Sequence, residues 1–419
     1  MAAEWAVRRL GDLTENFDSL RVPVKEADRR SGPYPYYGAS GIVDYVDQYL
    51  FDGEYLLIAE DGENLRSRNT PVAFLARGEF WVNNHAHVVR GNREADTRFL
   101  MYALMTANMD AYLTGSTMPK LTQQNLNRIQ ILAPPVDEQR AIAHILGTLD
   151  DKIELNRRTS ETLEAIARAI FKSWFVDFDP VRAKAEGREP PCMDTETAAL
   201  FPDAFEDSEL GEIPKGWSVG RVADLCTTQY GYTAAAVDEP VGPKLLRVTD
   251  INKRNWIEWE QVPHCPIGDG EETKYRLAVG DIVVARMADP GKAAIVEEEV
   301  DAVFASYLVR LKTQSLAHSY YLYGFLKSPA YAEYCIGAMG GSVQANMNAK
   351  VIVAADMVIP PTDVLQSLLD RVLPFRQRLV DAVQESRTLA AIRDALLPKL
   401  ISGQIRVKNA ERFSEEVMS

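Results

Sequence analysis

The chain has 419 residues, of which 46% are hydrophobic and 25% are charged, and its formal net charge is −14. This length is too great for one hydrophobic core, so we expect two or more domains. The negative charge argues against strong nonspecific DNA binding by the isolated chain, because DNA carries a negative charge at every phosphate.

Membrane and disulfide-stabilised classes are also excluded. No apolar stretch approaches the ~20 residues needed to cross a bilayer, and the first residues lack the pattern of a signal peptide. The four cysteines are scattered, without the paired spacing of a zinc site or a disulfide framework. The sequence therefore predicts a cytoplasmic protein with no metal and no other cofactor.

The first 136 residues are predicted to form a mixed α/β body. Gly53–Ala59 is a continuous apolar run bounded by turns, which predicts a buried strand that presents Glu60 and Asp61 at its exposed end. Thr97–Met109 has helical periodicity. We also expect a short strand and turn at 5–13, a Gly/Pro/Tyr loop at 34–41, and strands at 42–46, 80–89 and 129–133.

A long helix is predicted from Asp137 to Phe175. Its apolar side chains recur at alternating spacings of four and three, the pattern of a coiled-coil seam, with polar residues at two central positions. About 39 residues at 1.5 Å each give a helix roughly 58 Å long, too long for a small globular body to cover. The seam consists of Ile142, Leu146, Leu149, Ile153, Asn156, Ser160, Leu163, Ala167, Ile170 and Trp174.

The same seam returns 226 residues later, and the two runs align without a gap. The alignment extends backwards, so that Pro134-Pro135 falls on Pro360-Pro361 and Thr122 falls on Asn348. The chain therefore contains one unit twice. The second seam consists of Leu368, Val372, Phe375, Leu379, Ala382, Ser386, Leu389, Arg393, Leu396 and Leu400.

The two long helices are expected to pack as an antiparallel pair, because the chain must run out and back. Asn156 and the matched Ser160 and Ser386 would then lie in the seam, where a buried polar residue fixes the register at some cost in stability. Pro374 is expected to bend or break the first turns of the second helix, since proline removes a backbone donor.

The second body repeats the strands of the first but not its loops. Gly280–Arg286 stands at the place of Gly53–Ala59, and Ala302–Arg310 at the place of Trp81–Arg90. A repeated scaffold with dissimilar loops suggests two related sites that recognise different things.

Much of the negative charge is local. Residues 177–214 contain eleven acidic and three basic residues, in a stretch rich in Pro, Ala and Glu. This segment is interpreted as a solvated acidic linker, and the two bodies beside it are only mildly acidic.

Residues at both ends of the repeated helices resemble a known family. Pro134–Ala143, Leu149–Asn156 and Phe171–Pro180 are similar to the central conserved region of type I restriction–modification specificity (S) subunits. Leu396–Val407 is similar to that family's distal conserved region, and the two-copy layout also belongs to the family. The resemblance covers essentially the whole chain. One departure is that the second Pro-Pro pair is followed by 362–366, which lacks the Glu-Gln of the first copy.

The resemblance implies an α/β (α+β) fold, with two pseudo-repeated target-recognition domains separated by a long antiparallel two-helix coiled-coil spacer. It implies a non-catalytic subunit that recognises a bipartite site in double-stranded DNA, one half per domain, with the spacer setting the gap. It also implies two adenine-N6 methyltransferase subunits as partners and, through them, endonuclease/translocase subunits. The expected parts are domain 1 at 1–136, spacer helix 1 at 137–176, the linker at 177–214, domain 2 at 215–361, spacer helix 2 at 362–401 and a C-terminal tail at 402–419.

An enzyme is the rival class. No Pro-Pro pair follows Asn or Asp, so the motif of adenine methyltransferases is absent, as are Gly-x-Gly-x-x-Gly and P-loop patterns. Glu60 and Asp61 could be a catalytic pair, but adjacent strand residues point to opposite faces. His85 and His87 lack further metal ligands, which favours packing or hydrogen bonding. We therefore expect no catalytic residue. The other alternative is a coiled-coil adaptor with two protein-binding heads and no DNA specificity.

The loops of both bodies contain side chains that can contact base edges. The first body has such loops at 36–40, 60–68 and 116–120, and the second at 229–233, 286–292 and 342–348. The sequence contains no base-by-base code, so it predicts contact residues and no target. The expected DNA-binding residues are Tyr36, Tyr37, Ser40, Asp61, Asn64, Arg66, Arg68, Ser116, Thr117, Lys120, Gln229, Tyr230, Tyr232, Thr233, Arg286, Lys292, Ser342, Gln344, Asn346 and Asn348.

Overall fold

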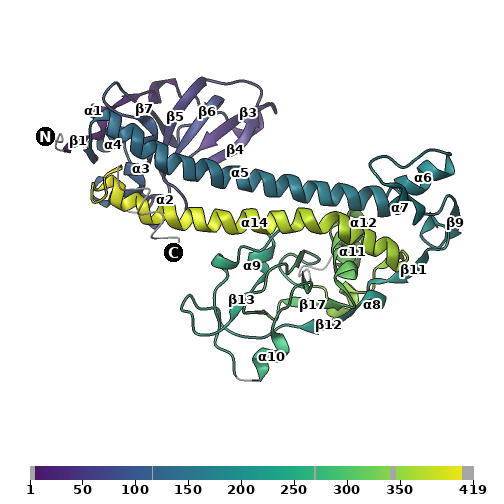
Figure 1. Cartoon of the computed structure of the whole chain (residues 1–419). Helices are drawn as coiled ribbons and strands as arrows, with labels where there is room; N and C mark the ends of the chain where they lie inside the picture. Colours follow the sequence, from purple (N-terminus) through teal and green to yellow (C-terminus); the bar gives the residue numbers. More distant parts are fainter. Residues whose placement is uncertain (1–4, 116, 269, 340–345, 408–419) are drawn as a thin grey trace. The chain divides into compact units, whose positions relative to one another are not determined.

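The computed structural model describes residues 5–115, 117–268, 270–339 and 346–407 (Figure 1). The chain forms two compact units. Unit 1 contains the residues up to Glu154 and those from Thr388 onward, and unit 2 is Leu155–Arg387. The predicted contact residues Ser116, Ser342 and Gln344 lie outside the described residues.

Unit 1 is built on a six-stranded sheet, in the order β2-β7-β5-β6-β3-β4. Its strand β5 (Phe51–Ala59) pairs antiparallel with both β6 and β7, and its last four residues are buried. The Asp96 carboxylate accepts the Phe99 N–H and starts helix α3 (Thr97–Thr106), which packs in the same core. The other strands are β2 (Thr14–Asn16), β3 (Tyr34–Gly38), β4 (Gly41–Val46), β6 (Ala73–Val82) and β7 (Ala86–Gly91).

A separate strand pair completes unit 1. The strands β1 (Ala6–Arg9) and β8 (Gln130–Ala133) pair antiparallel, which holds the start of the unit beside the segment that leads into the first long helix. The short helical turns are α1 (Leu10–Leu13), η1 (Asp18–Leu20), η2 (Glu26–Asp28), α2 (Asn64–Ser67), η3 (Asp110–Tyr112) and α4 (Gln123–Leu126).

Unit 2 repeats this plan with different additions. Its main sheet has the order β12-β17-β14-β15, in which the first three strands match β2-β7-β5, and the pair β11–β18 matches β1–β8. The strands are β9 (Phe205–Ser208), β10 (Gly211–Pro214), β11 (Ser218–Arg221), β12 (Cys226–Tyr230), β13 (Lys244–Leu246), β14 (Ile282–Ala285), β15 (Ala293–Ile295), β16 (Ala302–Phe304), β17 (Leu308–Thr313) and β18 (Asp356–Ile359). The helices are α6 (Asp179–Ala185), α7 (Thr195–Ala199), α8 (Val222–Leu225), α9 (Val248–Ile251), η4 (Trp259–Gln261), α10 (Glu271–Tyr275), α11 (Leu316–Leu326), α12 (Pro329–Met339) and α13 (Ala349–Ile352).

Two 40-residue helices, α5 (Val136–Phe175) and α14 (Thr362–Ile401), each continue from one unit into the other. The expectation that Pro374 could break the second helix is wrong, because α14 is continuous through it. Pro374 is exposed, so water can hydrate the Asp370 carbonyl that loses its helical donor.

Within unit 2 the two helices are antiparallel, as predicted. Asn156 Nδ2 donates to Glu385 Oε2 at 2.9 Å, and Glu164 pairs with Arg376, so residue numbers rise along α5 as they fall along α14. Asn156 and Ser160 are both buried in this seam, with exposed fractions of 3% and 1%. The bond from Asn156 to Glu385 crosses the seam and favours one register, whereas Ser160 donates to the Asn156 carbonyl of its own helix.

The helix segments of unit 1 pack in the same antiparallel way. Leu146 of α5 and Leu396 of α14 belong to one buried core. Arg393 Nη1 donates to Asp150 Oδ1 at 2.8 Å, and the Tyr102 hydroxyl of α3 donates to the other oxygen of Asp150. The sheet-containing body of unit 1 is thus joined to its helices by the Tyr102 hydroxyl and by an ion pair.

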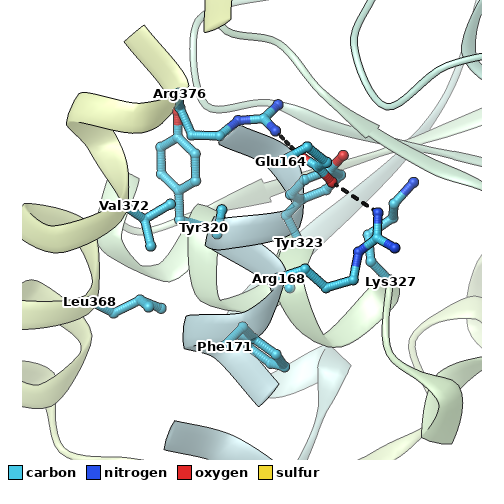
Figure 2. A pocket seen from close by; sticks show the side chains of 11 residues that line it. Glu164, Arg168, Phe171, Tyr320, Tyr323, Lys327, Leu368, Val372 and Arg376 are labelled. Atoms are coloured by element: carbon cyan, nitrogen blue, oxygen red, sulfur yellow. Dashed lines mark hydrogen bonds and ion pairs between the residues drawn. The ribbon is translucent and has the colours of Figure 1, made fainter. Parts of the chain in front are cut away.

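In unit 2 the long helices are joined to the rest of the unit by a buried ion-pair cluster around Arg376. Figure 2 shows Arg376 of α14 and Glu164 of α5 pointing toward each other. Arg376 is 2% exposed, and its Nε also donates to Glu297 Oε1 at 2.7 Å. The Tyr320 hydroxyl of α11 donates to the same Glu297 oxygen at 2.8 Å. Because buried charges need partners, this cluster couples α5, α11 and α14 to the segment that contains Glu297.

The segment 177–214 is folded, so its interpretation as a solvated linker is wrong. It contains α6, α7 and the antiparallel pair β9–β10. Phe178, Val181, Phe201 and Ile213 are buried, and the first three belong to the main core of unit 2. The acidic residues lie between these buried apolar residues in the sequence. A count of charges alone therefore does not show that the segment is folded.

Three strand predictions also need correction. The segment 34–41 contains the strand β3 rather than only a loop, and 80–89 is the end of β6, a turn and β7. Residues 302–310 likewise divide into β16 and the start of β17. In the last two cases the residues on both sides of the turn are buried, so the two strands resemble one longer strand in the sequence.

Candidate nucleic-acid interface

The first candidate site, site 1, lies where β5 of unit 1 ends. The Glu60 N–H donates to the His85 carbonyl at 2.9 Å, and the Leu121 N–H donates to the Glu60 carbonyl at 2.8 Å. Asp61 and Lys120 form an isolated antiparallel bridge. These bonds bring the predicted loop 60–68, the described part of the loop 116–120 and the turn at His85 together. Site 1 is defined as Glu60, Asp61, His85 and Lys120.

Charges of both signs meet in site 1. Glu60 Oε2 lies 2.7 Å from Arg21 Nη1, and Glu60 Oε1 lies 3.2 Å from Lys120 Nζ. Burial raises the pKa of Glu60, but the hydrogen bond from Arg21 and the nearby cations outweigh it and hold the pKa below its usual value. Asp61 Oδ2 lies 2.9 Å from His85 Nδ1, within hydrogen-bond distance. The His85 side chain is 53% exposed. Site 1 therefore presents a carboxylate and an imidazole to solvent.

His87 is buried next to site 1 and is not part of its surface. It is 1% exposed, with Nδ1 2.6 Å from Asp18 Oδ2 and Nε2 2.7 Å from the Leu121 carbonyl. The two ring nitrogens thus face a carboxylate oxygen and a backbone carbonyl oxygen, which hold the ring in place. Within the described ranges, no group of three or more His, Cys, Asp or Glu is placed to hold a metal ion.

The second candidate site, site 2, is formed by the same backbone bonds at the end of β14 in unit 2. The Arg286 N–H donates to the Tyr307 carbonyl at 3.0 Å, and the Met347 N–H donates to the Arg286 carbonyl at 2.8 Å. Met287 and Asn346 form the isolated bridge. Site 2 is defined as Tyr230, Arg286, Met287, Tyr307 and Asn346.

The two sites are therefore equivalent in backbone structure and different in chemistry. Arg286 occupies the place of Glu60, Met287 that of Asp61, Tyr307 that of His85 and Asn346 that of Lys120. This corrects the predicted alignment by one residue, since Arg286 matches the residue after Ala59 and not Ala59 itself.

Aromatic side chains frame site 2. The Arg286 guanidinium carbon lies 5.1 Å from the centre of the Tyr230 ring, and the Tyr230 hydroxyl accepts the Ala349 N–H at 2.9 Å. Tyr230 and Tyr307 are 44% and 56% exposed, which is high for tyrosine. The predicted loops 229–233 and 286–292 and the described end of 342–348 thus meet at one surface.

Other predicted residues of unit 1 have structural roles. Tyr36 is 1% exposed and its hydroxyl accepts the Val24 N–H at 3.0 Å, so we leave it out of the candidate surface. Tyr37 packs against Phe80, and Arg68 donates to the carbonyl of Ala107 at 2.6 Å. The remaining predicted positions lie nearer the surface: Asn64 bonds to Thr70, Arg66 donates to the Gly115 carbonyl, and Ser40 and Thr117 are exposed.

The remaining predicted residues of unit 2 lie beside site 2 or support it. Gln229 accepts from Arg310 and donates to the Lys274 carbonyl, and the Tyr232 ring packs at a tilt against the Tyr275 ring. Asn348 starts α13 by accepting the Val351 N–H at 3.0 Å. Thr233 is exposed, and Lys292 lines a cleft of about 550 Å³ together with Arg168 and Lys327.

Sequence reasoning missed Tyr307, whereas it assigned His85 to packing or hydrogen bonding, and the structure shows His85 bonded to Asp61. The 226-residue repeat could have found part of this, because it places Lys120 on Asn346 and Glu60 on Arg286. It could not have paired His85 with Tyr307, since the loops before them differ in length.

Comparison with known proteins supports a common family. Residues 2–165 match the family model described as "Type I restriction modification DNA specificity domain". The MjaIX specificity subunit of Methanocaldococcus jannaschii is 25% identical, over 97% of this chain and 94% of that protein. The HindI specificity subunit of Haemophilus influenzae is 24% identical, over 96% of this chain and 100% of that protein. A putative specificity subunit from the same bacterium is 41% identical over 146 residues, 35% of this chain and 37% of that protein.

A solved structure supports the fold. The S subunit of a type I restriction–modification system from M. genitalium superimposes with a TM-score of 0.60 and 14% identity, covering 95% of this chain and 96% of that chain. In the part of the chain that the structure describes, no helix is long and apolar enough to span a membrane.

Proposed function

Because residues 2–165 match the specificity-domain model and two specificity subunits align with nearly the whole chain, we propose that this chain is a type I restriction–modification specificity subunit that recognises a bipartite site in double-stranded DNA. Site 1 contacts one half of the target and site 2 contacts the other. The observation that carries this proposal is the pair of sites themselves. The same backbone hydrogen bonds present unlike side chains at equivalent positions, which suits two readers of different base sequences.

The contact surface proposed for each half includes nearby residues that are exposed or half-buried. In unit 1 these are Ser40, Asn64, Arg66 and Thr117, beside site 1. In unit 2 they are Thr233, Lys292 and Asn348, beside site 2. Phosphate contacts from such side chains would fix the position of the duplex, while the site residues contact base edges.

The chain has no catalytic role in this proposal. Its partners are two adenine-N6 methyltransferase subunits and, through them, endonuclease/translocase subunits. The near-repeat of the two units supports this stoichiometry, because two similar surfaces bind two identical partners. Native mass spectrometry of the co-purified complex tests it: two methyltransferase copies per chain are expected, and a stable one-to-one complex at saturating partner contradicts it.

Sequence-specific DNA retention distinguishes this function from that of a protein-binding adaptor. In a filter-binding assay with a randomised duplex library, the chain with its methyltransferase should enrich a two-part sequence motif. A protein-binding adaptor would enrich none, with or without the partner. The same assay without the methyltransferase should show weak retention, because the chain is acidic.

The gap between the two halves is proposed to depend on α5 and α14. Four residues inserted between Glu154 and Leu155, with four more between Arg387 and Thr388, keep the helix pairing inside each unit intact. Four residues lengthen a helix by about 6 Å, or one to two base pairs at ~3.4 Å each. We expect the same half-sites with a gap longer by one or two base pairs; an unchanged gap at full activity contradicts the proposal.

A further inference from the structure

Arg286 lies at the centre of site 2 and has no acidic partner among the residues that the structure describes. Its Nε is buried and, within the described residues, has no hydrogen-bond acceptor. The described part of the chain also provides no ion pair for its guanidinium, which lies over the Tyr230 ring. Neighbouring arginines of unit 2 differ: Arg310 pairs with Asp281 at 3.2 Å, and Arg276 pairs with Glu272.

The position of Arg286 is fixed although its charge is not neutralised. The backbone of Arg286 is held on both sides, by the Tyr307 carbonyl and the Met347 N–H, and its side chain is held by stacking on Tyr230. Tyr230 is itself fixed by the Ala349 N–H. A guanidinium has five N–H donors and no acceptor, so this side chain is oriented in advance to donate to a molecule outside the protein.

The surroundings of Arg286 favour a base edge over a phosphate. A phosphate site gathers several cations or backbone N–H groups, whereas Arg286 is the one cation among the defined site 2 residues. The others are the exposed rings of Tyr230 and Tyr307, the thioether of Met287 and the amide of Asn346. Apolar surfaces and an amide suit the plane and edge of a base, and they offer little to a hydrated phosphate.

We propose that Arg286 donates two parallel hydrogen bonds to O6 and N7 of a guanine in the major groove. The half-site contacted by unit 2 therefore contains a G·C pair that depends on this side chain. This inference rests on the proposed function. In unit 1 the equivalent position is Glu60, an acceptor already occupied by Arg21 and Lys120, so it supplies no such donor. The end of the strand is thus a specificity-determining position.

Selection from a randomised duplex library tests the assignment, using the full chain with its methyltransferase. Wild type, R286A, R286K and the control R254A are compared; Arg254 is an exposed arginine of unit 2 that pairs with Glu258. For R286A we expect one G·C pair of one half-site to become degenerate and affinity for the wild-type site to fall about 5- to 150-fold. R286K should lose the same base preference, because lysine lacks the planar two-donor fork. R254A should keep the motif.

The outcomes separate this inference from the proposed function. A wild-type motif that R286A leaves unchanged, or that R286A weakens equally on all sequences, overturns the guanine assignment alone. Retention of the guanine by R286K shows that only charge matters and also overturns it. A wild-type chain that enriches no motif overturns the proposed function and this inference with it. Circular dichroism melting of R286A guards against misfolding, and R286K then provides the test.

Discussion

Unit 1 and unit 2 share a backbone plan but use opposite chemistry at two matched places. At the strand end, unit 1 has the acid Glu60 and unit 2 has the base Arg286. On the long helices, Asp150 of unit 1 and Arg376 of unit 2 lie 226 residues apart, at the same position of the repeat. Asp150 pairs with Arg393 and accepts a hydrogen bond from Tyr102 of α3. Arg376 pairs with Glu164, and Tyr320 of α11 belongs to the same cluster. Backbone pairing thus maintains the repeat, while side-chain identity is free to diverge.

The contacts that Asp150 makes in unit 1 and Arg376 makes in unit 2 also differ in burial. This difference predicts the largest effect of a substitution on stability. Arg376 is 2% exposed between Glu164 and Glu297, so among the described ion pairs R376A leaves Glu297 without a cation and Glu164 with only Arg168, at 3.6 Å. We expect unit 2 to lose about 3–5 kcal/mol. Urea unfolding followed by hydrogen exchange measures it unit by unit. R378A, which removes an exposed arginine of the same helix, should change stability by less than about 0.5 kcal/mol. A loss below about 1 kcal/mol for R376A would refute the coupling role.

The contacts of Asp150 in unit 1 are more exposed, so their loss should matter less. Y102F removes the hydroxyl that donates to Asp150, but Asp150 keeps Arg393 and solvent access. We expect about 1–2 kcal/mol of destabilisation, confined to unit 1. Y45F on the exposed strand β4 is the matched control and should be neutral. Equal losses for Y102F and R376A would remove the contrast between the units.

A smaller effect is expected from pH, because site 1 rests on buried carboxylates. Burial raises the pKa of Asp18, but bonds from His87 and the Val88 N–H outweigh it, so the pKa is lowered; that of Glu60 is lowered as well. Folded-state pKa values below the usual 3.8 and 4.5 mean that these groups stabilise unit 1 above those values. The contribution is lost as pH falls through the folded values.

Urea midpoints of unit 1 between pH 7 and pH 3, roughly the range in which carboxylates titrate, check this linkage. The wild-type midpoint should fall below pH ~4.5, and the D18N/E60Q variant should show a shallower fall over the same range. Parallel curves for the two proteins would show that Asp18 and Glu60 do not contribute.

The repeat and the long helices could be predicted because both are periodic. Heptad spacing located α5 and α14 to within one residue, and the constant offset paired Thr122 with Asn348. The predicted contact loops of unit 2 meet at one surface, since Arg286 lies over Tyr230 and Met287 pairs with Asn346, while their contact with DNA stays a prediction. What could not be predicted was the sorting within each loop. Tyr36 has a polar hydroxyl group yet is buried, while Tyr307 has buried neighbours in the sequence yet is exposed. Only tertiary packing decides which tyrosine side chain reaches the surface.

The buried cluster of Arg376 was also beyond sequence reasoning. Arg376 and Glu164 each lie next to a predicted seam position, where a charged residue is usually solvated. Their burial depends on Glu297, which comes from a loop that no helical pattern connects to α14. Pairing of this kind requires three-dimensional proximity, and periodicity does not contain that information.

The central claim is that unit 1 and unit 2 recognise separate halves of one DNA target. It is tested most directly by replacing residues 1–133 with the equivalent body of another specificity subunit. Single-molecule sequencing of methylated DNA, from cells carrying the chimera and the methyltransferase, then gives the target motif. We predict that one half of the motif changes while the other half and the gap stay as in wild type. A change in both halves, or in neither, would contradict the claim.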